Sequence, residues 1–257
     1  MTEQVLNESW LERARAALAL ALDVPDRAKA LELARSVTGG VGVVKVGLEL
    51  FLAEGPSLVS ELTQMGLDVF LDLKFHDIPA TVERAARAAG RLGVSYLTVH
   101  AGEGPSLVAA AVRGAAQGAL TAGKKAPIVL AVTVLTSLTR EELASVGLDR
   151  DLAELVELRA ERALDAGAGG LVCSPLEVER LRVLGSEHRL VVPGIRPSWA
   201  LVAGDDQARV SGPGQAIQAG ADLLVVGRPI RDADDPGKAA RRIVEEVASA
   251  LRARQGA

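Results

Sequence analysis

Residues 68–79 read Asp-Val-Phe-Leu-Asp-Leu-Lys-Phe-His-Asp-Ile-Pro, an apolar run that passes into charged residues and a proline. A short apolar run bounded by turn-forming residues predicts a buried β-strand over 68–73. Pro79 then begins a helical pattern that ends before Gly93. Proline in the first turn and glycine just past the last turn are typical of helix boundaries. The stretch therefore predicts one β-strand followed by one α-helix.

The same strand-then-helix pattern repeats on both sides of this stretch. Eight apolar runs without hairpin alternation predict buried parallel strands, over residues 18–23, 42–47, 68–73, 95–100, 128–134, 170–173, 190–193 and 222–227. Between and after them, amphipathic stretches predict helices over residues 25–37, 56–65, 79–92, 105–120, 152–166, 175–184, 213–219 and 236–251.

This alternation predicts an α/β fold in which helices cover a parallel sheet. Eight such units close a (β/α)8 TIM barrel, and 257 residues is a typical length for one barrel domain. We therefore expect residues 1–257 to form a single catalytic domain, with residues 1–17 as a short N-terminal helical extension. An open doubly wound sheet is the alternative, but the first strand–helix turn lacks the GxGxxG pattern.

The composition limits the partners and the location of the protein. The 29 basic and 33 acidic residues are interspersed, with a net charge of −4, which disfavours a nucleic acid polymer as partner. No apolar run approaches the roughly 20 residues of a membrane-spanning helix, and no targeting segment is visible at the N-terminus. A single cysteine, Cys173, cannot form an internal disulfide, which favours a reducing, cytoplasmic location.

Charged residues interrupt or follow the first three predicted strands: Asp23, Lys45, Asp72, Lys74 and Asp77. Catalytic groups of this fold lie at the carboxyl ends of the strands. Because strand side chains alternate, Asp72 and Lys74 should point the same way. A buried lone charge is costly, so we expect the two lysines and three aspartates to form an alternating chain. A purely structural ion-pair network is the alternative, but such pairs add little stability over apolar packing.

Two arginines near the last predicted strands indicate an anion site. Arg228 follows Gly227 after the eighth strand, and Arg196 follows the seventh. Phosphate sites of these barrels are often built by the loops after strands 7 and 8, and arginine offers a charged fork to phosphate. Either arginine alone would be an ordinary surface residue. Residues 197–210 are either a lid over this site or a solvated loop.

The charged stretch resembles the D-x-K-x-x-D-I-P-x-T signature of the orotidine 5′-phosphate decarboxylase family. Further stretches match motifs of that family in order along nearly the whole chain, at residues 21–23, 45–47, 132–137, 193–197 and 226–229. The resemblance implies a barrel enzyme that converts orotidine 5′-monophosphate to UMP and CO2, the final step of de novo pyrimidine nucleotide synthesis.

The resemblance also implies the catalytic roles. Lys74 would donate a proton to the pyrimidine carbon that loses CO2, and Asp72 would lie against the substrate carboxylate. A positioned ammonium suits this reaction because it stabilises the developing negative charge and then delivers the proton. Asp23 and Lys45 would hold the ribose hydroxyls and join the charged chain. Neither a cofactor nor a metal is implied.

The remaining site residues follow from the same resemblance. Thr136 would contact the pyrimidine edge. Asp77 and Thr81 would reach into the neighbouring subunit's site, because enzymes of the family work as homodimers with shared active sites. The phosphate of the nucleotide substrate would be bound by Gly227, Arg228, Gln207 and Arg196.

Two other functions compete with this reading. Metal-dependent sugar-phosphate decarboxylases or aldolases reuse the D-x-K-x-x-D frame with additional carboxylates that hold Mg²⁺, whereas this chain continues with Ile78-Pro79 and Thr81. The three histidines have no metal-ligand spacing. A non-catalytic barrel that binds a phosphorylated ligand is the second competitor, but it would not need alternating lysines and aspartates at the strand ends.

Overall fold

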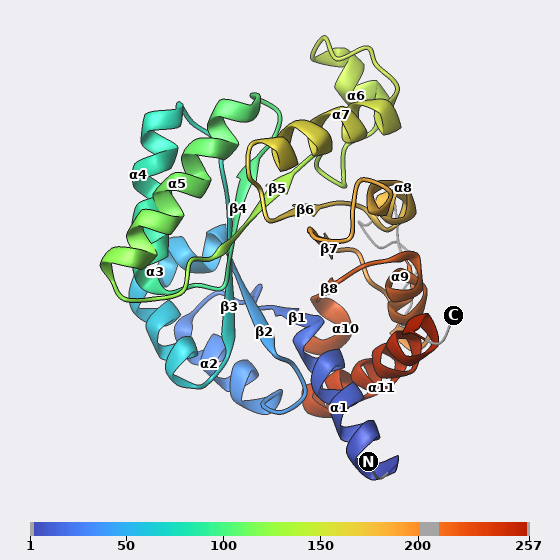
Figure 1. Ribbon diagram of the computed structural model, residues 1–257. Coiled ribbons are helices and arrows are strands. Elements are labelled where there is room, and N and C mark those ends of the chain that lie inside the picture. Colours follow the sequence, from blue (N-terminus) through green and yellow to red (C-terminus); the bar gives the residue numbers. More distant parts are fainter. Residues whose placement is uncertain (1–2, 201–210, 256–257) are drawn as a thin grey trace.

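The computed structural model describes residues 3–200 and 211–255 and contains a closed barrel of parallel strands (Figure 1). The strands are neighbours in chain order, and the last pairs with the first to close the barrel. They are β1 (Leu18–Ala21), β2 (Val43–Gly47), β3 (Asp68–Phe75), β4 (Tyr96–His100), β5 (Ile128–Val132), β6 (Gly170–Val172), β7 (Arg189–Val192) and β8 (Leu223–Val226). The predicted (β/α)8 barrel is confirmed.

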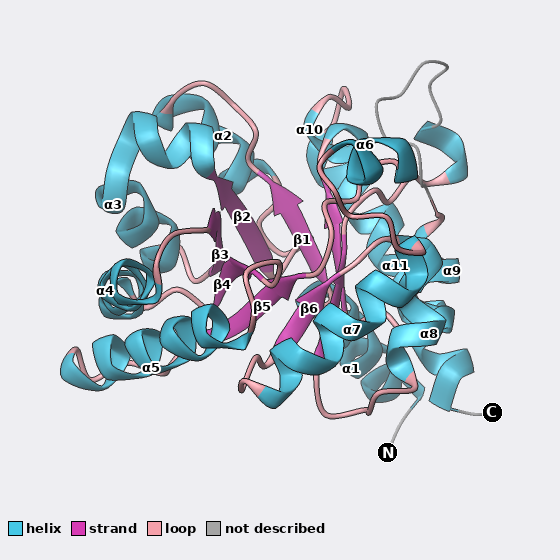
Figure 2. Ribbon diagram, turned by 90° about the horizontal axis from the view of Figure 1, so that it is seen from above, coloured by secondary structure: helices cyan, strands magenta, loops and turns pink. Residues whose placement is uncertain are grey.

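Helices surround the strands, as the view from above shows (Figure 2). The α-helices are α1 (Glu3–Ala16), α2 (Arg27–Ser36), α3 (Leu48–Gln64), α4 (Pro79–Leu92), α5 (Pro105–Thr121), α6 (Arg140–Ser145), α7 (Leu152–Asp165), α8 (Val178–Arg182), α9 (Pro213–Ala219), α10 (Arg228–Arg231) and α11 (Pro236–Gln255). Two short 3₁₀ turns, η1 (Pro175–Glu177) and η2 (Ser198–Ala200), complete the set. Within the described residues, no helix is both long and apolar enough to cross a membrane.

The apolar side chains form two layers, one on each face of the barrel wall. In β1, Leu18 and Leu20 pack outward against the helices, whereas Ala19 and Ala21 face the barrel interior. Phe70 of β3 is also in the interior cluster and is fully buried. Small and large residues thus share the interior. Because strand side chains alternate between the two faces, polar residues near the strand ends point to the mouth of the barrel.

Some helices differ from the sequence prediction. The helix expected over 56–65 is preceded by another helical segment that begins at Leu48, and the two meet at a kink where Gly55 has φ 69° and ψ −164°. This first segment was not predicted, because the apolar residues before Gly55 do not show a helical period. The short helices α6 and α10 were also missed, because neither is long enough to show a periodic apolar face. Arg27 connects α2 to the first half of α3 by donating hydrogen bonds to the Glu54 carboxylate, at 3.1 and 3.2 Å.

Helices α4 and α5 approach each other so closely that their backbones touch. A Cβ atom added at Gly118 of α5 would overlap the backbone carbonyl of Arg87 in α4, and one at Gly114 would overlap that of Glu83. A Cβ atom added at Gly90 of α4 would likewise overlap the backbone carbonyl of Ala115 in α5. The spacing of these glycines therefore determines how α4, which directly follows β3, sits on the barrel.

Candidate active site

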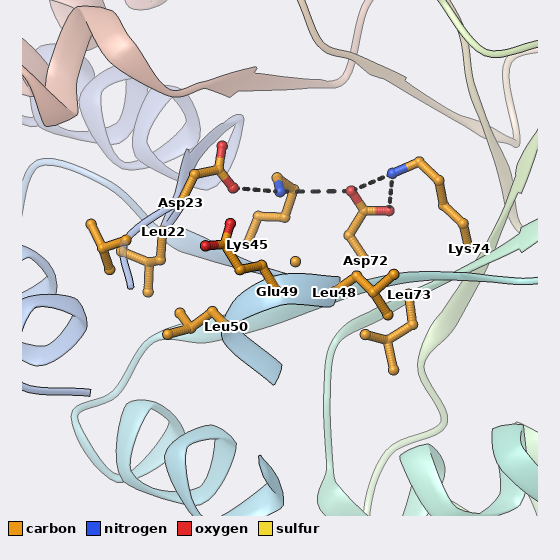
Figure 3. Close-up of a pocket in the computed structure, with 11 residues that line it drawn as sticks. Leu22, Asp23, Lys45, Leu48, Glu49, Leu50, Asp72, Leu73 and Lys74 are labelled. Carbon is orange, nitrogen blue, oxygen red and sulfur yellow. Dashed lines mark hydrogen bonds and ion pairs between the residues drawn. The ribbon is translucent and has the colours of Figure 1, made fainter. Parts of the chain in front are cut away.

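Four charged side chains form a continuous chain across the carboxyl ends of β1, β2 and β3 (Figure 3). The Nζ atom of Lys45 lies 3.3 Å from Oδ1 of Asp23 and 3.7 Å from Oδ2 of Asp72. The Nζ atom of Lys74 contacts both carboxylate oxygens of Asp72, at 2.9 and 2.8 Å. The order Asp23–Lys45–Asp72–Lys74 alternates in sign, so each interior charge has an opposite charge on either side.

Strand β3 carries Asp72 and Lys74 at a point where its register with β4 is irregular. Leu71 is paired with Leu97 and Phe75 with Val99, so three residues of β3 stand opposite one residue of β4. Lys74 has a φ of 45°, and no other non-glycine residue of the described chain has a positive φ. Leu71 and Leu73 pack on the helix-facing core, as expected from strand alternation. A non-glycine residue in this region of φ is strained and is often found at functional sites.

The Asp72 carboxyl is held in its charged form. Burial by itself raises its pKa, but the charges of Lys74 and Lys45, with hydrogen bonds from Lys74 and Thr98, outweigh burial and lower the pKa below its ordinary value. Thr98 is not among the site residues predicted from the sequence. This threonine lies in the apolar run of β4 on the same face as Tyr96, which packs against the barrel interior, and that alternation could have identified it.

Asp77 does not join the charged chain, which corrects the expectation that all five charged residues would pair with one another. Strand β3 ends at Phe75, and the backbone then turns to begin α4 at Pro79. The exposed Asp77 side chain accepts a hydrogen bond of 2.6 Å from the backbone N–H of Ile78. Among the described residues it has no ion pair with Lys45 or Lys74. Nearby Thr81, on the first turn of α4, is partly buried and accepts a hydrogen bond from Arg84 at 3.5 Å.

Lys45 borders three adjoining cavities of about 280, 440 and 190 Å³. The first, drawn in Figure 3, extends along β2 and the start of α3, where Glu49 points toward Asp23 and Lys45. The smallest is mostly apolar and contains Thr136 with Asp72 and Lys74 on its wall. Thr136 therefore lies on the surface of the same cavity as the charged pair.

Three of the four residues predicted to bind phosphate line the 440 Å³ cavity. Gly227, Arg228 and Arg196 line it together with Asp23 and Lys45. Arg196 is only 8% exposed, whereas Arg228 is exposed. A further arginine that the sequence analysis did not single out, Arg231 of α10, lines the same cavity. Gln207 and most of the proposed lid lie outside the described residues.

Two histidines stand beside the charged chain. The rings of His76 and His100 are 5.0 Å apart, and Nε2 of His76 lies 2.9 Å from the Glu103 carboxylate. Burial, followed by the neighbouring charges of His76 and Lys74, lowers the pKa of His100, so that its ring is neutral near pH 7. His100 is therefore a neutral polar group at the edge of the site.

The grouping of side chains gives no candidate metal site among the described residues. In the part of the chain that the structure describes, no three His, Cys, Asp or Glu side chains are grouped as metal ligands. Asp23 and Asp72 lie on either side of the Lys45 ammonium, at 3.3 and 3.7 Å. A cation placed between these two carboxylates would have to displace that ammonium.

Comparison with known proteins adds independent observations. A family model described as orotidine 5′-phosphate decarboxylase / HUMPS family matches residues 16–243. A protein of Anaeromyxobacter sp. (strain K) named orotidine 5′-phosphate decarboxylase is 54% identical over 224 residues, which are 87% of this chain and 94% of the relative. A protein of Paramagnetospirillum magneticum with the same name is 45% identical over 229 residues, or 89% of this chain and 97% of the relative.

A solved structure agrees with the fold. The crystal structure of orotidine 5′-phosphate decarboxylase from Lactobacillus acidophilus superposes with a TM-score of 0.79 and 37% sequence identity. The match covers 90% of this chain and 99% of that one. The family-model match, over residues 16–243, includes all of the charged strand ends described above.

Proposed function

The chain belongs to the orotidine 5′-phosphate decarboxylase / HUMPS family, and we propose that it decarboxylates orotidine 5′-monophosphate to UMP. One observation carries the proposal: the Lys74 ammonium is held against both oxygens of Asp72, on the wall of an apolar cavity. This is an arrangement in which a proton donor is held in place beside a mostly apolar surface.

The proposed reaction uses Lys74 as the acid. The bond between C6 of the pyrimidine and its carboxylate breaks, the electron pair stays on C6, and CO2 departs. The Lys74 ammonium stabilises the negative charge that develops on C6 and then transfers a proton to it, which forms UMP. Lys74 is left as a neutral amine that regains its proton from solvent. The Asp72 carboxylate keeps the ammonium in place and faces the departing carboxylate.

The neighbouring residues would bind the rest of the nucleotide. Asp23 and Lys45 lie between the cavity with the reacting pair and the cavity with the arginines, where a ribose would have to lie. Thr136 would contact the pyrimidine edge. Phosphate would be bound by Gly227, Arg228 and Arg196, together with Gln207. The energy of phosphate binding would hold the ring against Lys74.

We include a homodimer in the proposal, with Asp77 and Thr81 reaching the partner's site. Support comes from the exposure of Asp77 and of Ile78, which is 65% exposed beside the mouth of the barrel. The apolar Leu48 and Leu52, at the start of α3, are also exposed. Co-expression of Lys74→Ala and Asp77→Ala chains tests the idea, because each mixed dimer would contain one intact site of two. With statistical mixing, half of the dimers are mixed, so about a quarter of the wild-type activity should be recovered. No recovery from chains shown to mix would reject the sharing of sites.

A metal-dependent sugar-phosphate enzyme is the competing function within the family. The position of Lys45 disfavours it, because the ammonium lies between the two carboxylates that a divalent cation would need. We therefore propose a reaction without metal or other cofactor. We also place the protein in the cytoplasm, since its one cysteine is free and buried.

The deciding experiment follows the loss of orotidine 5′-monophosphate absorbance in the presence of EDTA. We expect rapid turnover by the wild type, loss of turnover in Lys74→Ala, and full turnover in Lys125→Ala, a control lysine exposed before β5. Turnover that needs added Mg²⁺ would favour the sugar-phosphate branch. Tight UMP binding without turnover under either condition would favour the non-catalytic barrel.

A further inference from the structure

We propose that Thr98 is a positioning residue that holds Asp72 and Lys74 in the geometry needed for proton transfer. The inference rests on the proposed decarboxylation and adds a residue that neither the charged motif nor the phosphate motif contains. Thr98 is in the middle of β4, in the apolar run Tyr96-Leu-Thr-Val-His100.

The Thr98 hydroxyl joins the two reacting groups directly. It donates a hydrogen bond of 2.9 Å to Oδ1 of Asp72, and it accepts one of 2.9 Å from the backbone N–H of Lys74. The side chain has no exposed surface. A hydroxyl has a single proton to donate, and here the proton is committed to a carboxylate oxygen. The group therefore orients the Asp72 carboxylate and favours its ionised form, to which the two lysines contribute more.

The backbone of β3 explains why a hydroxyl is needed at this point. Between the paired residues Leu71 and Phe75, β3 contains two more residues than the facing part of β4. A regular ladder cannot bond every N–H in such a bulge. The Lys74 N–H is instead satisfied by the Thr98 side chain, and Lys74 adopts its φ of 45° there. Thr98 therefore completes the bulge that turns Lys74 toward Asp72.

The other groups that face Asp72 cannot replace this contact. Lys45 reaches it from β2 and Lys74 from β3, and both are flexible cations. His100, from the same strand as Thr98, contributes charge only if it is protonated. Asp23 of β1 acts through Lys45. Thr98 is the short, buried member of this group, and a short side chain on a central strand keeps its geometry better than a lysine does.

The test compares Thr98→Val, which keeps the shape and removes the hydroxyl, with Thr98→Ser, which keeps the hydroxyl. We expect Thr98→Val to lower kcat on the order of tenfold to a hundredfold, as for a small misplacement of reacting groups. KM and the Kd of UMP should stay within about threefold, because phosphate and ribose contacts are unchanged. Thr98→Ser should restore most of the lost kcat.

A second readout is the acid limb of the kcat/KM profile. Removal of a hydrogen bond to the charged carboxylate raises the pKa of Asp72, so the limb should move to higher pH in Thr98→Val and return in Thr98→Ser. Thr133→Val is the matched control, because Thr133 is also buried and its hydroxyl hydrogen-bonds, among the described residues, only to the backbone carbonyl of Val172, at 3.4 Å. We expect it to lower the melting temperature without a comparable loss of kcat.

Wild-type kcat and an unmoved acid limb in Thr98→Val would overturn the inference while the decarboxylase function stands. Equal losses of kcat in folded Thr98→Val and Thr98→Ser would also overturn it, since the hydroxyl would then be irrelevant. If Thr98→Val does not fold, Thr98→Ala replaces it in the same comparison with Thr98→Ser. Absence of turnover by the wild type would instead reject the proposed function itself.

Discussion

The guanidinium of Arg231 donates a hydrogen bond of 3.0 Å to the backbone carbonyl oxygen of Asp23, across a sequence separation of 208 residues. The same guanidinium is fixed by Asp232, through contacts of 2.6 and 2.9 Å to its two carboxylate oxygens. Arg231 therefore connects the helix that follows β8 to the end of β1. It joins the side of the site with Gly227 and Arg228 to the first member of the charged chain.

We predict that Arg231→Gln weakens UMP binding about fivefold to tenfold, which corresponds to ~1 to 1.4 kcal/mol. The reason is that the segment with the proposed phosphate-binding residues Gly227 and Arg228 loses its connection to the end of β1, and the cavity loses a positive charge. Isothermal titration with UMP measures the change. Arg252→Gln, at an exposed position of α11, is the control and should bind UMP as the wild type does. An unchanged Kd in Arg231→Gln would show that the connection has no role in binding.

Asp72 predicts a specific dependence of stability on pH. Burial raises its pKa, but Lys74, Lys45 and the hydrogen bonds lower it below the ordinary value of 3.8. The folded protein then binds the proton less tightly than the unfolded chain does. The contribution of Asp72 to stability is therefore present above about pH 4 and is lost as the pH falls through the folded-state pKa.

Urea denaturation of the wild type and Asp72→Asn tests this dependence. We expect the difference in their free energies of unfolding to shrink as the pH is lowered from about 6 to about 3. Asp149→Asn, at an exposed position, is the control and should show a small difference at every pH. A difference that stays constant for Asp72→Asn would mean that its carboxylate is not stabilised by the lysines.

Gly118 should not tolerate a side chain. Alanine favours a helix over glycine by about 1 kcal/mol, but the added Cβ would overlap the Arg87 carbonyl of α4. Overpacking of this kind costs ~1 to 3 kcal/mol, and a shift of helix backbones is needed to relieve it. We expect Gly118→Ala to lower the melting temperature by several degrees. Gln117→Ala, one residue earlier and exposed, should not lower it. If Gly118→Ala melts at the same temperature as the wild type, the close contact between the two helices is refuted.

Cys173 should be unreactive in the folded protein. The thiol follows β6 in the barrel wall and is fully buried. Burial raises its pKa well above the ordinary value, so the reactive thiolate is scarce at neutral pH. We expect labelling with a thiol-specific disulfide reagent to follow global unfolding in urea and to be slowed by UMP, which stabilises the folded state. Fast labelling without denaturant, unaffected by UMP, would contradict the burial.

Much of the site could be recognised in the sequence because its residues directly follow apolar strands. Asp23, Lys45, Asp72 and Lys74 were expected at one end of the barrel, and they form one chain of contacts. Asp77 was expected in the same chain, but it lies apart. Strand alternation cannot foresee that β3 ends at Phe75 and that the backbone turns away before Asp77.

The sequence by itself determined the barrel, because the repeating pattern of apolar runs and amphipathic helices is local. Eight such units favour a closed parallel barrel, in which helices cover every strand. Only the tertiary structure decided the contacts of Thr98 and Arg231, since each depends on the relative positions of strands far apart in the chain. The register of β3 against β4 places Thr98 beside Asp72 and Lys74. The closure of β8 on β1 places Arg231 beside Asp23. Hydrogen bonds of this kind depend on the exact register. The apolar alternation of a strand specifies which face is buried, but it does not encode an irregularity such as the one between Leu71 and Phe75.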